Sequence, residues 1–173
     1  KDTGPSREVG GQHSARGNRV QLAGVPELRF IRCESMVIYA GKVMDVGVIL
    51  KKMWYKAGIT GVVLNAPEEI EAEFIGAGLS NQIGSTKPGF TLLFVRDRAE
   101  AEARFKPTAE NIERDSLLWV AYPKGSSKVK TDINRDSLWK LTEPWGYRPV
   151  SQVSIDKIWS VIRFRPSDVV KSR

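Results

Sequence analysis

The chain has 173 residues, of which 41% are apolar and 27% charged, and a formal net charge of +7 at pH 7, which fits one soluble globular domain. Cys33 and His13 are alone of their kinds, which excludes an internal disulfide and a cysteine-rich zinc site and leaves almost nothing for a Ser-His-Asp triad or a histidine-ligated metal. The apolar runs fall far short of the roughly 20 residues that a membrane span needs, and no basic-then-apolar leader is seen, so we expect a cytoplasmic protein with no membrane partner and no metal.

The positive charge is concentrated in the last third of the chain. Residues 116–173 hold 11 basic and 5 acidic side chains, a net charge of +6, whereas residues 36–115 hold 10 basic and 11 acidic ones. Such asymmetry is typical of a protein that meets an anionic ligand or nucleic acid. A basic surface that only keeps the protein soluble explains the same numbers, and both interpretations stay open.

Residues 1–35 differ in composition from the rest. Residues 1–19 are rich in Gly, Ser and Arg and show almost no apolar periodicity, which is typical of a disordered segment. A stray strand at residues 28–31 is the one element expected before Met36. We therefore predict a disordered or appended leader over residues 1–35 and a single α/β domain over residues 36–173.

Helical and strand patterns alternate through the middle of the chain. Three helices are predicted, over residues 46–55, 68–75 and 98–105. Two buried strands are predicted from continuous apolar runs, at residues 59–64 and 90–95. Pro107 should break the third helix before a further turn, and a weak strand is expected near Ile83.

A buried strand, a basic loop and a helix organise the last third. Apolar residues 117–122 predict a strand that ends at Pro123, because proline cannot donate to a sheet ladder. Thr131 or Asp132 is expected to cap a helix that runs to about Trp145. Two alternating segments then predict a β-hairpin, residues 150–155 and 159–165.

The order β-α-β-α-β-α-β-β identifies the fold class as α/β. It predicts a three-layer, Rossmann-like domain with a mostly parallel sheet, helices on both faces and a C-terminal antiparallel β-hairpin. Ligands of such sheets bind beyond the carboxyl ends of the parallel strands. The turns expected at that edge hold Asn65, Asp97, the loop 124–128 and Asp156.

Four segments resemble a family of small uncharacterised bacterial proteins that are classed as domains of unknown function. The segments are KKMWYKAG at 51–58, VVLNAPE at 62–68, PKGSSKVKTDINRD at 123–136 and VSIDKIWSVIRFRP at 153–166. The resemblance covers roughly residues 48–173. It implies the topology of a reduced S-adenosylmethionine-dependent methyltransferase, including the terminal hairpin, and carries no activity with it.

The turn after the first strand departs from the methyltransferase pattern. Methyltransferases place a glycine-rich turn there, whereas this chain has Asn65, Ala66 and Pro67, which lack glycine's conformational freedom. Residues 80–86 also lack the carboxylate that would bind ribose hydroxyls. No G-x-G-x-x-G fingerprint occurs, and Gly125 alone does not make a Walker A motif. The sequence therefore assigns no cofactor.

The basic loop is the strongest candidate for a ligand site. Backbone amides, the dipole of the following helix and the lysines would all favour an anionic small molecule or a nucleotide. With the neighbouring turns, the predicted ligand-binding residues are Lys124, Gly125, Ser126, Ser127, Lys128, Lys130, Thr131, Asn65, Asp97 and Asp156. A solvated basic loop beside an ordinary helix cap is the plainer interpretation. No catalytic residue is identified.

Two other functions stay open, and the sequence does not decide whether the protein is an enzyme. A degenerate methyltransferase-derived enzyme would use Asn65, Asp97 and Asp156, although an aspartate between two strands more often forms the hairpin turn. A nucleic-acid-binding module would use the basic last third. Tryptophans suit base stacking, but the positions of Trp119 in a buried run and Trp139 on the apolar side of a helix indicate core packing.

Overall fold

A computed structural model of the protein describes residues 36–39 and 42–170, which all belong to the compact unit Cys33–Arg173. The predicted leader over residues 1–35, with its stray strand at 28–31, lies outside the described residues. The domain boundary predicted near Met36 therefore stays a prediction.

Strands and helices alternate along most of the described part. The strands are β1 Met36–Tyr39, β2 Lys42–Asp45, β3 Gly61–Leu64, β4 Phe90–Phe94, β5 Leu117–Pro123, β6 Tyr147–Ser154 and β7 Trp159–Pro166. The helices are α1 Val46–Lys52, α2 Glu68–Gly76, α3 Arg98–Glu110, α4 Arg135–Thr142 and the short 3-10 helix η1 Glu143–Trp145.

Five strands form an open sheet in the order β3-β4-β5-β7-β6, and β1 and β2 form a separate hairpin that was not predicted. β3, β4 and β5 pair in parallel, whereas β7 pairs antiparallel with both β5 and β6. The α/β class, the parallel strands and the C-terminal hairpin are thus confirmed, and the sheet as a whole is mixed. The weak strand predicted near Ile83 is wrong, because the described residues there hold just an isolated bridge between Val62 and Ser80.

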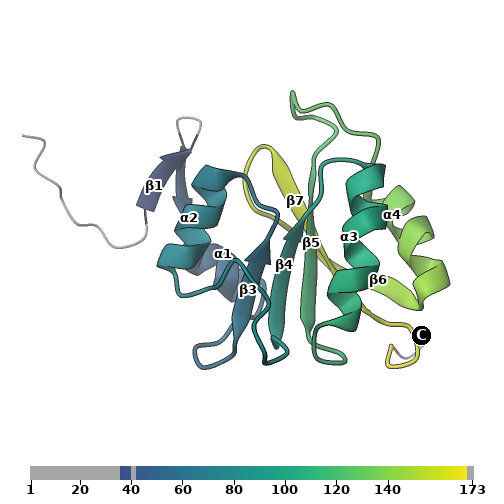
Figure 1. Cartoon of the computed structure of the whole chain (residues 1–173). Helices are drawn as coiled ribbons and strands as arrows, with labels where there is room; N and C mark the ends of the chain where they lie inside the picture. The colour runs from purple at the N-terminus through teal and green to yellow at the C-terminus, as the bar shows by residue number, and fades with distance from the viewer. Residues whose placement is uncertain (1–35, 40–41, 171–173) are drawn as a thin grey trace, which may run out of the picture. The chain divides into compact units, whose positions relative to one another are not determined.

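The core lies on both faces of the sheet because buried side chains alternate along the strands. In β4, Phe90, Leu92 and Phe94 pack with buried residues of α1 and α2, whereas Leu93 packs with buried residues of α3 and α4. Figure 1 shows these two pairs of helices on opposite sides of the strands. The helices thereby cover both faces and leave the ends of the strands as the places where loops gather.

Two helices end at other places than the sequence predicts. α1 ends at Lys52 rather than at residue 55, and Trp54 then adopts a φ of 60°, which a right-handed helix cannot contain. α3 continues through Pro107, so the predicted break there is wrong. The proline lies in the last turn, where it removes one helical hydrogen bond, and the buried Phe105 and Thr108 hold that turn against the core.

The helix after the basic loop begins later than predicted. Its N-cap is Asn134, so the caps predicted at Thr131 and Asp132 are wrong. Asn134 Oδ1 accepts from the amides of Asp136 and Ser137 at 2.9 Å, and Ser137 Oγ accepts from the Asn134 amide at 2.7 Å. This reciprocal capping box satisfies the first amides of α4. The helix ends at Thr142, where η1 continues to Trp145.

Candidate ligand site at the carboxyl edge of the sheet

Four turns lie along one edge of the sheet: those that follow β3, β4 and β5, and the turn between β6 and β7. A hydrogen bond links each of them to the next. Asn65 Nδ2 donates to Phe94 O at 2.9 Å, which joins the end of β3 to the end of β4. Thr131 Oγ1 donates to Arg96 O at 2.8 Å, which joins the β4 turn to the loop after β5. The Lys124 amide donates to Ile158 O at 2.7 Å and joins that loop to the β6–β7 turn. The predicted site residues therefore lie along one edge.

Asn65 takes a backbone conformation that we expected of a glycine and not of this residue. Its φ is 56°, in the left-handed region that glycine usually occupies and that asparagine tolerates better than most residues. Its side-chain amide is fixed, because Nδ2 donates to Glu100 Oε2 at 3.2 Å as well as to Phe94 O. The turn after β3 thus has a glycine-like backbone, but the Asn65 side chain itself bridges the crevice to β4 and α3.

The N-terminus of α3 is occupied by carboxylates of the protein itself. Asp97 Oδ1 accepts from the Glu100 amide at 2.8 Å, and Asp132 Oδ1 accepts from the Arg98 amide at 2.8 Å. Glu100 Oε2 accepts from the Arg96 amide at 2.9 Å. These negative charges complement the positive end of the helix dipole, so the dipole of α3 is already balanced within the protein, and any attraction for an external anion must come from the lysines of the loop.

Lys124 and Asp156, both predicted ligand residues, are joined to each other. Lys124 Nζ donates to Ser154 Oγ and to Asp156 O, each at 2.5 Å. Asp156 Oδ1 accepts from the amides of Ile158 at 2.7 Å and Trp159 at 2.6 Å. The aspartate therefore forms the hairpin turn, and the lysine fastens that turn to the end of β5.

The rest of the basic loop faces solvent. Gly125, Ser126, Lys128 and Lys130 are exposed, and no salt bridge involving either lysine occurs among the described residues. The Ser127 amide donates to Lys124 O at 2.8 Å and closes a tight turn, while Ser127 Oγ is buried without a partner in the part of the chain that the structure describes. The loop thus keeps two unneutralised lysines and one unpaired hydroxyl.

A cavity of about 340 Å³ opens where this loop meets the end of β4. It is lined by Asp97, Lys130, Thr131 and Asp132. Thr131 and Asp97 were predicted from the sequence, as was Lys130, whereas Asp132 was expected as a helix cap. The change in role follows from the later start of α4, which leaves Asp132 in the loop with its carboxylate against α3. The site therefore mixes one cation with two carboxylates, and the helix N-terminus that it meets is that of α3 rather than that of α4.

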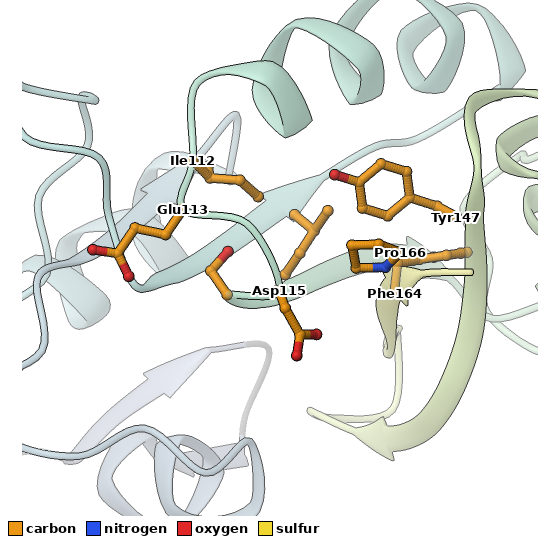
Figure 2. A pocket seen from close by; sticks show the side chains of 8 residues that line it. Ile112, Glu113, Asp115, Tyr147, Phe164 and Pro166 are labelled. Carbon is orange, nitrogen blue, oxygen red and sulfur yellow. The ribbon is translucent and has the colours of Figure 1, made fainter. Parts of the chain in front are cut away.

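The opposite edge of the sheet holds a second cavity, of about 430 Å³. Its charged groups are paired within the protein, because Arg114 forms an ion pair with Asp168 and Lys87 Nζ donates to Glu110 O at 3.2 Å. The neighbouring cleft in Figure 2, lined by Tyr147, Phe164 and other side chains, is too narrow for a ligand. Ser116 Oγ is unpaired in that cleft among the described residues, but the cleft has no room for a molecule to reach it.

No protein-family model matches the sequence, and no curated protein matches it significantly. Within residues 36–39 and 42–170, no helix is both long and apolar enough to cross a membrane. In the same residues no group of three or more His, Cys, Asp or Glu side chains is placed to hold a metal ion. The function must therefore be argued from the site itself.

Proposed function

We propose that the chain binds a small anionic molecule that also carries hydroxyl groups, with nucleotides as the leading class, at the cavity beyond β4 and β5. The observation that carries the proposal is the placement of Lys130 beside two carboxylates in one hollow at the carboxyl edge of parallel strands. Sheets of this kind bind ligands at that edge, and a concave site with a few polar groups is the usual form of a small-molecule site.

The lysines and the carboxylates of the site contact different ends of such a ligand. Lys130 lines the cavity, and Lys128 lies two residues before it in the same loop. Both are exposed and form no salt bridge within the described residues, so they are free to meet a phosphate or carboxylate. Asp97 and Asp132 each bind an α3 amide through Oδ1. Their Oδ2 atoms are then the acceptors for ligand hydroxyls. An anion without hydroxyl groups would leave these acceptors without a donor.

A three-layer Rossmann-like fold of methyltransferase-like topology belongs to the same proposal. The strand pairings support it, because β3, β4, β5 and β6 all run in one direction and β7 runs against them between β5 and β6. α1 and α2 cover one face of the sheet, and α3 and α4 cover the other. The antiparallel pairing of β6 with β7 supports the terminal hairpin that the resemblance to reduced methyltransferases implies.

Calorimetry with the full chain tests the ligand site. A thermal-shift panel of nucleotides, phosphosugars and inorganic phosphate first selects the probe, because a ligand of the folded state raises the melting temperature. Lys128→Gln with Lys130→Gln should then weaken the selected probe about tenfold or more, since two charge-assisted contacts are lost. The control pair Lys106→Gln with Lys140→Gln removes the same charge from exposed positions on α3 and α4. Equal affinities of the two double variants would refute the proposal.

A degenerate methyltransferase-derived enzyme is the second candidate, and the backbone at Asn65 favours it. The φ of 56° gives the turn after β3 the conformation that a glycine would supply, although Asp156 is committed to the hairpin turn. Such an enzyme should bind S-adenosylmethionine and lose that binding when Asn65 is replaced by leucine. Calorimetry that detects no heat of binding at millimolar cofactor would exclude it.

A further inference from the structure

Trp54 and Arg163 form a pair of an exposed aromatic ring and a half-buried cation, remote from the loop Lys124–Lys130 in the sequence. Trp54 is 48% exposed, and Arg163 Cζ lies 5.0 Å from its ring centroid. Trp54 has a φ of 60°, a conformation that is rare for a bulky residue and strained. Strained backbone positions cluster at functional sites, which makes this exposed ring a candidate for a function.

The segment that carries Trp54 is anchored to the buried core. Trp119 is fully buried and its Nε1 donates to Met53 O at 3.1 Å, which fixes the segment that carries Trp54. The rings of Trp54 and Trp119 lie 5.8 Å apart at 57°. Arg163 is the register partner of Trp119 on the neighbouring strand. Trp54 is therefore held in place rather than loosely attached.

Positive charge gathers on the same face of the sheet. Arg163 is half-buried, forms no salt bridge in the described part of the chain, and leaves its Nε without a partner there. Burial and the nearby Arg165 both lower the pKa of its guanidinium. Alternation along β7 puts Arg165 on this face, and the strand register puts Arg148 opposite Arg165. Asp115 forms an ion pair with Arg165 and its charge also acts on Arg163, but one carboxylate does not balance Arg148, Arg163 and Arg165 together.

Lysines surround Trp54 along the chain as well. Lys51, Lys52 and Lys56 lie within three residues of it and are exposed. Partial burial of the Arg163 guanidinium without an ion-pair partner costs free energy. A bound polyanion would offset that cost by supplying the partner. A partner that joins planar apolar rings to a chain of negative charges meets both features at once, since bases stack on aromatic rings while phosphates contact cations.

We propose that Trp54, Arg163 and the flanking cations, Lys51, Lys52, Lys56 and Arg148, form a binding surface for single-stranded nucleic acid. Trp54 stacks on a base, and the cations contact the phosphates on either side. The face is distinct from the cavity at Lys130, so each can be tested without the other.

Fluorescence anisotropy of the full chain with a labelled oligothymidylate of about 15 nucleotides, within the usual site size, tests the surface. Trp54→Ala should weaken binding about tenfold. Arg163→Gln should weaken it and flatten the salt dependence by roughly 0.7 in the slope of log K against log salt, the loss of one phosphate contact. Trp54→Phe keeps a stacking ring and should retain most of the affinity.

Matched variants elsewhere complete the test. Trp139 is exposed, at 40%, so the core packing predicted for it is wrong, and it lies on α4. Trp139→Ala should therefore bind as the unsubstituted chain does, as should Lys106→Gln with Lys140→Gln. Trp54→Phe and Arg163→Gln keep the test valid if Trp54→Ala does not fold. Undetectable binding at low salt, equal affinities of the Trp54 and Trp139 variants, or equal competition by polyglutamate would each overturn the proposal.

Discussion

Asp115 combines a left-handed backbone with an ion pair. Its φ is 58°, which aspartate tolerates better than most residues, and its Oδ1 accepts from Arg165 Nε at 2.6 Å. The two side chains are 32% and 29% exposed. The hydrogen bond from Arg165 holds the pKa of the Asp115 carboxyl below its ordinary value. The pair therefore stabilises the fold most where the carboxyl is ionised in both the folded and the unfolded chain.

Asp115→Asn should lower the free energy of unfolding by about 1 kcal/mol at pH 7. Because the folded pKa is the lower one, this contribution is fully present above the unfolded pKa of about 4 and is lost as the pH falls through the folded pKa. Asparagine keeps the shape and the tolerance for positive φ, so the change tests the charge alone. Urea titrations of both proteins from pH 7 to pH 2 should converge at the acid end. A difference that stays constant over that range would contradict this account.

Asn65 contributes both a backbone conformation and a bridge. Asn65→Ala should lower the free energy of unfolding by about 2 kcal/mol, since it loses the hydrogen bonds to Phe94 O and Glu100 and forces alanine into a φ of 56°. Asn65→Gly loses the same hydrogen bonds without the strain and should cost about 1 kcal/mol. Urea unfolding of the two variants separates these effects. Equal losses would show that the backbone conformation carries no energy.

At the scale of the element, α4 shows which residue starts a helix. Asn134→Ala removes the oxygen that caps two amides and should lower the free energy of unfolding by about 1 kcal/mol. Asp136→Ala, two residues further along the chain, keeps the capping box and should lower the free energy of unfolding much less. Denaturant unfolding measures both. A greater loss for Asp136→Ala would mean that the charge near the dipole, rather than the cap, sets the start of α4.

The predicted helix boundaries failed where long-range contacts outweigh local signals. Thr131 and Asp132 are good N-cap residues by type, but Thr131 Oγ1 bonds to Arg96 O and Asp132 bonds to the Arg98 amide. Pro107 should break a helix, yet the burial of Phe105 and Thr108 holds the last turn. In each case the deciding partner lies on another element or in the core, and the sequence alone does not reveal it.

At the scale of the whole molecule, the buried strands were predicted well because their apolar runs are continuous. β4 and β5 lie within a residue of the predicted segments, and the β6–β7 hairpin follows its alternating pattern. The pairing of β7 with β5 depends on a choice between neighbours that periodicity does not encode. The partners of Lys124, which donates to Ser154 Oγ and Asp156 O, depend on a similar choice between neighbouring elements.

The structure also shows where the positive charge of the last third of the chain lies. Arg148, Arg163 and Arg165 lie on the β6–β7 hairpin rather than in the lysine loop, and Arg163 packs over the ring of Trp54. The exposed lysines of the loop and the arginines of the hairpin therefore lie on separate elements, and we propose a small ligand for the first and an extended one for the second. A single net charge could not distinguish these arrangements.

Nitrogen–proton correlation spectra of the full chain, titrated with a nucleoside monophosphate, test the central claim most directly. Ligand binding in the cavity should shift the amide signals of Asp97, Lys130, Thr131 and Asp132 first and most. The same titration with the unphosphorylated nucleoside should give weaker shifts at the same residues, since the lysines lose their partner. Shifts centred on Lys87 and Arg114 at the opposite cavity, or no shifts at millimolar ligand, would contradict the account.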